Sequence, residues 1–102
     1  RLKQLIIGKV TRDDHGAVMN SMIRLYARAL ESKKKISMGF EKTDTDEKYL
    51  AYADLFEERF MSLRVDIPLN EALDEGWRTM AECFEPQEVG IKKDILEAHW
   101  PK

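Results

Sequence analysis

The segment of residues 43–63 constrains the fold more than any other part of the chain. Its large apolar side chains recur at spacings of four, three, four and three residues. This rhythm places them on one stripe of an α-helix and leaves charged residues on the opposite side. The stripe consists of Tyr49, Ala53, Phe56, Phe60 and Leu63, with Leu50 and Met61 beside it. Aromatic rings in such a stripe cannot face water alone, so we expect the flanking segments to cover them, with Phe56 at the core centre.

The start of this helix carries residues that are typical of a helix N-terminus. Thr43 or Thr45 can accept a hydrogen bond from a free backbone amide in the first turn. The acidic residues that follow suit the positive end of the helix dipole; they are Asp44, Asp46 and Glu47. We therefore expect the helix to begin after one of the two threonines.

A second amphipathic helix is predicted before this one, from about residue 12 to about residue 32. Thr11 would cap it, with Asp14 completing a capping box. The lysines at 33–35 suit its carboxyl end, and an apolar turn around Gly39 follows. One face of the helix is apolar: Val18, Met19, Met22, Tyr26, Ala29 and Leu30, broadened by Ile23 and Leu25. The turn holds Ile36, Met38 and Phe40.

A third helix is predicted to start after Pro68, whose fixed φ suits a first helical turn, and to end at Glu85-Pro86. Gly76 lies inside it, where glycine costs about 1 kcal/mol relative to alanine. We expect Gly76 to permit close approach of another backbone, that of the 43–63 helix. The apolar face is Leu69, Leu73, Trp77, Met80 and Phe84. A last short helix is predicted to carry Ile91, Ile95, Leu96 and Trp100 and to stop at Pro101.

Composition supports the same fold class. Charged residues make up 35% of the 102 residues, and the dominant Leu, Ala, Glu and Lys favour helix. No extended alternation of period two, the pattern of a half-buried strand, appears anywhere in the chain. The prediction is an all-α protein, a compact helical bundle of three main helices plus short C-terminal helices.

Charge, cysteine content and the first residues limit the domain organisation and the classes of partner that the chain can have. Residues 1–10 are interpreted as a connector and 11–102 as a helical bundle domain; because the chain begins with Arg1 and not Met, we expect a segment of a longer polypeptide. A formal net charge of −2 with interspersed signs predicts no nucleic-acid partner. The single Cys83 excludes an internal disulfide. No apolar run approaches the ~20 residues that a membrane span needs.

No group of residues has the spacing of a catalytic or metal site. His15 and His99 have no metal-binding partner at ligand spacing, and we interpret them as a helix-start and a surface histidine. Cys83 lies at helical spacing with apolar residues, which favours core packing over a nucleophile. Trp77 is expected in the core and Trp100 in a partly exposed contact. Adjacent acids point about 100° apart on a helix and are expected to be solvated: Asp13-Asp14, Glu57-Glu58 and Asp74-Glu75.

Three stretches together resemble one known family. They are GKVTRDDH at 8–15, followed by VMN at 18–20 and YAR at 26–28; Thr45-Asp46 with YADLFEERF at 52–60; and LNEALDEGW at 69–77. In order and approximate spacing they are similar to segments of the non-catalytic beta chain of V-type and archaeal A-type rotary ATPases, over nearly the whole chain. The sequence departs from that family after residue 78 and in a shortened loop at 62–68.

The resemblance implies the C-terminal helical domain of this non-catalytic B (beta) subunit, a structural part of a rotary head that couples ATP synthesis or hydrolysis to proton or sodium transport. The parent subunit would alternate with the catalytic A subunit in a hetero-hexameric head around a central-stalk subunit. That head would be cytoplasmic and peripheral to the membrane, which it meets only through the ion-translocating sector. ATP or ADP with Mg would sit at subunit interfaces, and no cofactor is implied within this fragment, which is not expected to be catalytic by itself.

The resemblance also supplies a catalytic candidate. The family carries an arginine that stabilises charge on the transferred phosphoryl group, an arginine finger, shortly before the stretch that matches residues 8–15. Arg1-Leu2 matches the end of the motif that holds this arginine. Arg1 is therefore the candidate arginine finger, and no residue is assigned to cofactor or metal binding.

Two other function classes stay open from the residues alone. A stand-alone helical adaptor would bind a helix of another protein through an exposed apolar patch. A nucleic-acid contact would use the lysines at 33–35, but without interleaved aromatic residues their role at a helix carboxyl end is favoured.

Overall fold

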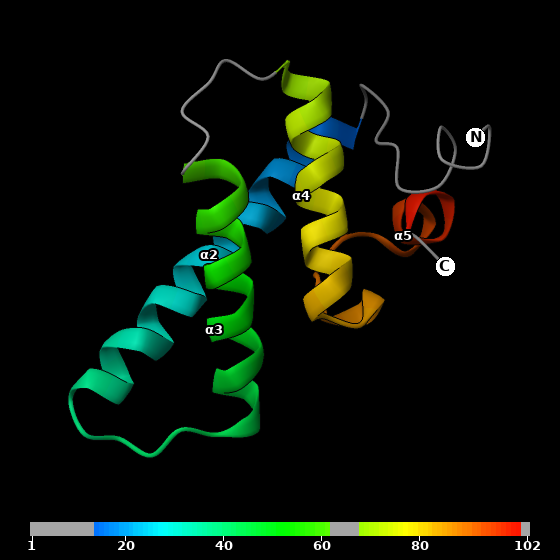
Figure 1. The fold of residues 1–102 in the computed structure, drawn as a ribbon. Coiled ribbons are helices and arrows are strands. Elements are labelled where there is room, and N and C mark those ends of the chain that lie inside the picture. Colours follow the sequence, from blue (N-terminus) through cyan, green and yellow to red (C-terminus); the bar gives the residue numbers. More distant parts are fainter. Residues whose placement is uncertain (1–13, 62–67, 101–102) are drawn as a thin grey trace.

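The structure, a computed structural model, describes residues 14–61 and 68–100. Three helices form the body: α2 (His15–Ser37), α3 (Asp44–Phe56) with its π-helical continuation η2 (Glu57–Met61), and α4 (Leu69–Cys83). A 3-10 turn, η3 (Pro86–Glu88), and the short helix α5 (Lys93–His99) follow. Helix α2 runs obliquely across α3 and α4, which lie side by side, and α5 lies on the far side of α4 from α3 (Figure 1). The described ranges contain no strand, which confirms the predicted all-α bundle.

Helix α2 extends farther than its predicted end near residue 32. It continues to Ser37 because its last turns pack against α3, where Ser32 is buried and Lys35 forms an ion pair. Gly39, at a φ of 96°, ends the helix in the left-handed conformation that glycine adopts without strain. The amide of Gly39 then donates to the carbonyl of Ile36, 3.0 Å away. The predicted cap Thr11 and the residues up to Asp13 lie outside the described residues.

Helix α3 begins where its sequence predicts. Thr43 is the cap, and its hydroxyl accepts a hydrogen bond from the Asp46 amide at 3.1 Å. The Asp46 carboxylate in turn accepts from the Thr43 amide at 3.0 Å, so the two residues satisfy two free donors reciprocally. Of the two predicted threonines, the structure therefore selects Thr43.

The boundaries of the last helices follow the prolines. Pro68 precedes the first turn of α4, and Pro86 opens η3 directly after α4 ends at Cys83. The last helix begins at Lys93, so Ile91 lies before it and not within it as predicted. Pro101, the predicted stop, and residues 62–67 of the shortened loop lie outside the described residues.

The core lies between α2, α3 and α4, and its centre differs from the prediction. Phe56 is only half-buried, whereas Tyr52, which the predicted stripe omits, is completely buried. Tyr52 is three residues from Tyr49 and four from Phe56, so it shares their side of α3. The largest fully buried side chains are Trp77, Tyr52, Leu73, Met80, Val18 and Val89. Trp77 is thus in the core as predicted.

Gly76 permits close approach of a different neighbour from the one predicted. A Cβ at this position would overlap Sδ and Cε of Met22, a side chain of α2. The three heavy atoms nearest to that Cβ all belong to the Met22 side chain, and none is a backbone atom of α3. The prediction that Gly76 meets the 43–63 helix is wrong, because α2 crosses α4 at this glycine and fills the space with a flexible side chain.

The apolar face of α2 is narrower than predicted. Val18, Met22 and Ala29 are buried, but Ile23 and Leu30 are among the exposed large hydrophobic residues. The two exposed residues lie seven positions apart, on the side of α2 that faces away from α3 and α4. They are therefore surface residues of this domain.

Candidate functional site

The one catalytic candidate, Arg1, lies outside the described residues. The same holds for the predicted connector of residues 1–10. Both assignments stay predictions.

His99 and Cys83 have the surroundings of structural residues. Among residues 14–61 and 68–100, no group of three or more His, Cys, Asp and Glu residues could hold a metal ion. His99 is not a surface residue as predicted: its side chain is 11% exposed, and its Nε2 lies 2.7 Å from Oδ2 of Asp14. Cys83 is half-buried, and burial raises the pKa of its thiol to about 11. A thiol with that pKa is protonated at neutral pH and a poor nucleophile, as predicted from its spacing.

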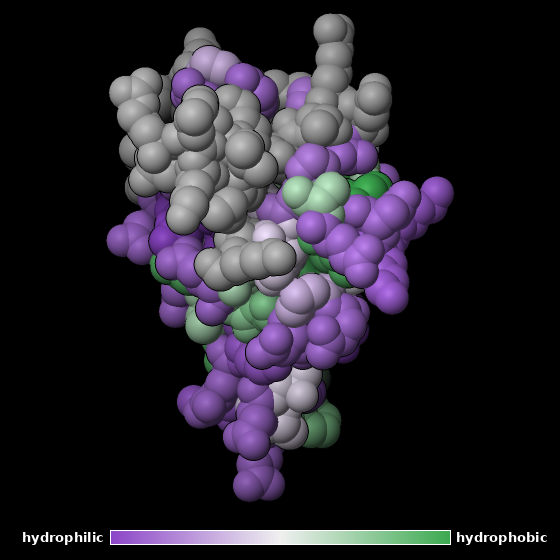
Figure 2. Space-filling view, turned by 90° about the vertical axis from the view of Figure 1, so that its right-hand side faces the viewer, coloured by the Kyte–Doolittle hydropathy of each residue, from purple (hydrophilic) through white to green (hydrophobic). Residues whose placement is uncertain are grey.

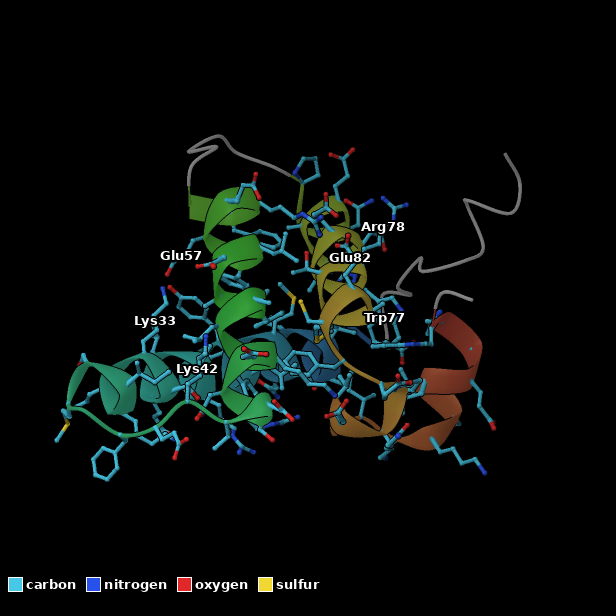
Figure 3. The ribbon with its side chains drawn as sticks, turned by 60° about the horizontal axis from the view of Figure 1, so that its bottom comes forward. Lys33, Lys42, Glu57, Trp77, Arg78 and Glu82 are labelled. Carbon is cyan, nitrogen blue, oxygen red and sulfur yellow. The ribbon has the colours of Figure 1, made fainter. Side chains whose placement is uncertain are left out.

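The adjacent acids are less solvated than predicted where a partner reaches them. The hydroxyl of Tyr26 donates to Oε2 of Glu57 at 2.6 Å, and Nζ of Lys33 lies 3.5 Å from the same oxygen. The hydrogen bond to Tyr26 lowers the pKa of Glu57, while the same bond raises the pKa of Tyr26 to about 12. Figure 3 shows Lys33 of α2 and Glu57 at the end of α3 on one side of the molecule. Glu57 therefore helps to join α2 to α3.

A second polar contact joins η2 to α4. Nη1 of Arg59 donates to Oγ1 of Thr79 at 2.9 Å and forms an ion pair with Glu82. The Glu82 carboxylate raises the pKa of Arg59, and Arg59 lowers the pKa of Glu82. Arg59 is one of the charged residues that the spacing of the 43–63 helix leaves opposite the apolar stripe, yet it ties two helices together.

The third cluster closes the turn between α2 and α3. Ser32 Oγ donates to Oδ1 of the buried Asp46 at 2.8 Å, and Nζ of Lys35 lies 3.0 Å from Oδ2. The backbone amide of Thr43 and then Lys35 hold the pKa of Asp46 well below its usual range. Two of the three lysines at 33–35 are thus paired with acids of this chain, Lys33 with Glu57 and Lys35 with Asp46. These charges serve the packing of α2 on α3.

The turn that follows α2 presents apolar side chains to solvent. Met38 is 66% exposed and Phe40 is 60% exposed. The predicted apolar turn around Gly39 is therefore present, but it is not folded into the core. Phenylalanine and methionine are both enriched in the buried centres of protein interfaces.

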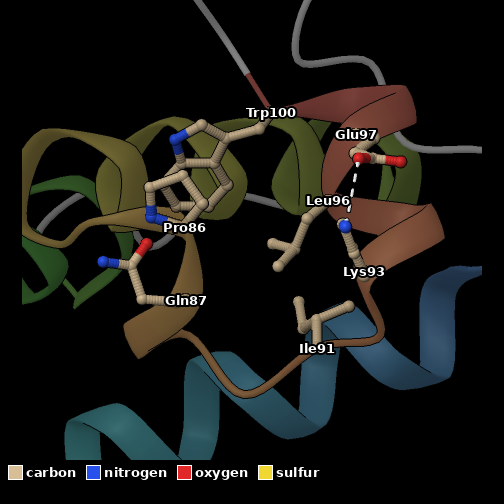
Figure 4. Close-up of a pocket in the computed structure, with 7 residues that line it drawn as sticks. All are labelled: Pro86, Gln87, Ile91, Lys93, Leu96, Glu97 and Trp100. Carbon is tan, nitrogen blue, oxygen red and sulfur yellow. Dashed lines mark ion pairs between the residues drawn. The ribbon is translucent and has the colours of Figure 1, made fainter.

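A groove of about 550 Å³ lies between η3 and α5. Figure 4 shows Trp100 and Pro86 on one side of it and Leu96 and Ile91 on the other. Lys93 and Glu97 form an ion pair 4.0 Å long at its rim. On this side of the molecule hydrophobic residues appear between hydrophilic ones (Figure 2). Trp100, predicted as a partly exposed contact, is half-buried in this wall.

Two long-range contacts could not be found from the sequence. Nη2 of Arg24 donates to the carbonyl of Val89 at 2.6 Å, across 65 residues, and the pair of Asp14 and His99 spans 85 residues. No spacing rule relates residues so far apart.

Within the described residues, no helix is both long and apolar enough to cross a membrane.

The arrangement offers contact surfaces, and comparisons with known proteins show which family shares the sequence. Residues 4–100 match the family described as "C-terminal domain of V and A type ATP synthase". The chain is similar over all of its 102 residues to the "V-type ATP synthase beta chain" of three bacteria: 55% identical to that of Chlamydia abortus, 56% to that of Protochlamydia amoebophila and 53% to that of Chlamydia pneumoniae. It spans 23% of the length of each of these relatives. No solved structure matches the chain.

Proposed function

Because the chain belongs to the family of C-terminal domains of V and A type ATP synthases, we propose that it is the helical C-terminal part of a non-catalytic beta subunit. Its role there is structural, in a rotary head that couples ATP synthesis or hydrolysis to the transport of protons or sodium ions. The observation that carries this proposal is the identity of 53–56% to V-type ATP synthase beta chains over every residue of the chain.

The proposed partners follow from the same assignment. In this proposal the beta subunit alternates with the catalytic subunit in a hetero-hexameric head, and the helical domains surround a central stalk. ATP or ADP with Mg binds at the interfaces between the subunits. The proposed location of the domain is cytoplasmic, peripheral to the membrane.

The exposed turn supports a mechanical role in such an assembly. Met38 and Phe40 stand at the end of the α2–α3 hairpin, well away from the α4–α5 contacts at the other side of the domain (Figure 1). A rigid hairpin whose tip is apolar can press on a partner and transmit force through its packed helices. We propose this tip as the contact with a neighbouring subunit or with the stalk.

The first experiment tests the tip in the assembled complex. Met38→Ser with Phe40→Ser should lower the yield of assembled head or the rate of ATP hydrolysis by it, because apolar contact area is lost. The thermal midpoint of the beta subunit should not change, since both side chains are exposed. Glu41→Gln, in the same turn, is the matched control and should leave assembly and turnover unchanged. Normal assembly and turnover of the double variant would reject the tip as a contact.

The second experiment tests the arginine finger. Arg1→Ala in the intact complex should slow ATP hydrolysis by roughly 10³-fold or more, the range seen when such a finger is supplied or withheld. Arg1→Lys keeps the charge but not the planar fork, so it should restore only part of the rate. Unaltered turnover of Arg1→Ala would place the finger elsewhere. That outcome would leave the domain assignment intact, because the assignment depends on the sequence match.

A further inference from the structure

The short helix α5 is attached to the rest of the domain in an unusual way. It has only seven residues, and the residue before it, Lys92, provides no side-chain cap. An isolated helix of this length is not stable in water. Its one buried apolar side chain is Leu96, and Ile95 is half-buried. Helix α5 therefore stays helical only while it is docked.

The docking contacts gather at its C-terminal end. The indole Nε1–H of Trp77 donates to the carbonyl of His99 at 2.7 Å. The ring of Trp100 meets the ring of Trp77 edge to face, with centroids 5.2 Å apart. Figure 3 shows Trp77 reaching from α4 toward α5. A single core tryptophan thus provides both the hydrogen bond and the ring contact that hold this end.

The third contact ties α5 to the start of α2. Oδ2 of Asp14 accepts a hydrogen bond from Nε2 of His99 at 2.7 Å. The two side chains are 17% and 11% exposed, so water screens the contact less than it would on an open surface. Asp14 is the first residue before α2, but its side chain does not cap that helix. Its carboxylate points instead to a residue 85 positions later in the chain.

The segment before α5 is held firmly up to one glycine. Val89 is fully buried, and its carbonyl accepts the bond from Arg24 of α2. Gly90 follows with a φ of 78°, a conformation that suits glycine, and a Cβ there would press on the Arg24 guanidinium. Beyond Gly90 the chain is exposed until Leu96, apart from the half-buried Ile91 and Ile95. The firm part of the chain therefore ends at Gly90.

We propose that residues 91–100 form a strap that pivots at Gly90 and is fastened to the start of α2 by the contact between Asp14 and His99, beside the contacts of its C-terminal end with Trp77. When the contact opens, α5 loses its anchor to α2 and exchanges between docked and undocked states. Five of the seven side chains that line the groove belong to the strap, so the groove exists only when the strap is closed. The other two, Pro86 and Gln87, belong to η3 and stay with the bundle. Closing of the strap is thus coupled to the start of α2, which Asp14 precedes.

Hydrogen exchange of the full chain, resolved by residue, tests the strap. The reporters are the amides of Leu96 and Trp100, which donate to the carbonyls of Lys92 and Leu96 at 3.1 and 2.8 Å. In the wild type they should exchange faster than bundle amides such as that of Tyr52, because α5 opens without global unfolding. His99→Ala should speed the two reporters by a further factor of about ten, the scale of one lost hydrogen bond to a charged group. The Val89 amide, on the fixed side of Gly90, should not change.

Two matched variants complete the test. Asp14→Ala should also speed the two reporters, and the double variant should speed them by less than the two single effects combined, because both variants remove the contact between Asp14 and His99. Glu97→Gln, which removes only the exposed pair with Lys93, should leave the reporters unchanged. The proposal is overturned if the reporters exchange at the rate of the bundle amides in the wild type. It is equally overturned if His99→Ala leaves their exchange unaltered, or if the effects of the two single variants simply add.

Discussion

Near their turn, helices α2 and α3 are joined mainly by a buried carboxylate, and farther along they are joined mainly by aromatic rings. Near the turn, the buried Asp46 carboxylate gathers Ser32 and Lys35 of α2. Farther along, the ring of Tyr26 stacks on that of Phe56 with centroids 4.5 Å apart, and Tyr52 fills the space between the helices. The ring contacts depend on buried area and shape, so the free energy lost when a ring is removed should increase with the buried fraction of that ring. The carboxylate contact depends on hydrogen-bond geometry and on the protonation state of Asp46, so its contribution to stability should depend on pH.

The largest effect should come from the most buried ring. Tyr52→Ala should lower the free energy of unfolding by about 3–5 kcal/mol, because a fully buried aromatic ring is replaced by a cavity. Tyr52→Phe is the control: it removes only the hydrogen bond of the hydroxyl to the carbonyl of Met22, worth about 1 kcal/mol. Urea denaturation measures both. A loss below about 1 kcal/mol for the alanine variant would mean that the core centre lies elsewhere.

Phe56 should matter less than Tyr52. It is half-buried and contacts the rings of Tyr26, Tyr52 and Phe60. Phe56→Ala should cost about 2 kcal/mol, since part of the ring is already in water and the stacking is lost. The same urea titration ranks the two alanine variants. If Phe56→Ala lowers the free energy of unfolding as much as Tyr52→Ala does, the contribution of a ring does not follow its burial as we infer.

The contribution of the Asp46 contact near the turn should be lost at acidic pH. The folded pKa of Asp46 lies below its unfolded value, so its contribution to stability is complete above about pH 4 and is lost as the pH falls through the folded pKa. Asp46→Asn cannot titrate, and its stability should decline less between about pH 5 and pH 2 than that of the wild type. Thermal melts over this pH range measure the difference. Parallel curves for the two proteins would mean that Asp46 is not a buried ionised partner of Lys35.

The smallest effect should come from the tip of the hairpin, beyond both kinds of contact. Phe40→Ser should change the free energy of unfolding by no more than about 0.5 kcal/mol, because the ring is 60% exposed. Leu73→Ser, which places a hydroxyl at a fully buried position, is the contrasting variant and should destabilise strongly. A large loss for Phe40→Ser would show that the tip packs on the domain itself.

The family match confirms the resemblance seen in the sequence. The structure confirms the predicted all-α fold in the residues that it describes. Local chemistry made the fold predictable: the helices follow the spacing of apolar residues, Thr43 and Pro68 stand at helix starts as expected, and the third helix ends just before Glu85-Pro86. These signals act within a few residues of each other, so the order of the chain contains them. The resemblance also named Arg1, which stays a prediction.

Only the tertiary structure decided which residues meet. Helical periodicity fixes the direction of a side chain around its own axis, but not the angle at which two helices cross or the neighbour that fills a gap. For this reason the sequence predicted Phe56 at the core centre, where the structure has Tyr52. It predicted α3 as the neighbour of Gly76, where Met22 of α2 fills the space. It also assigned Ile23 to the core, although this side chain is exposed. The contact of Asp14 with His99 has the same origin: α5 folds back to the start of α2, and no local rule joins residues so far apart.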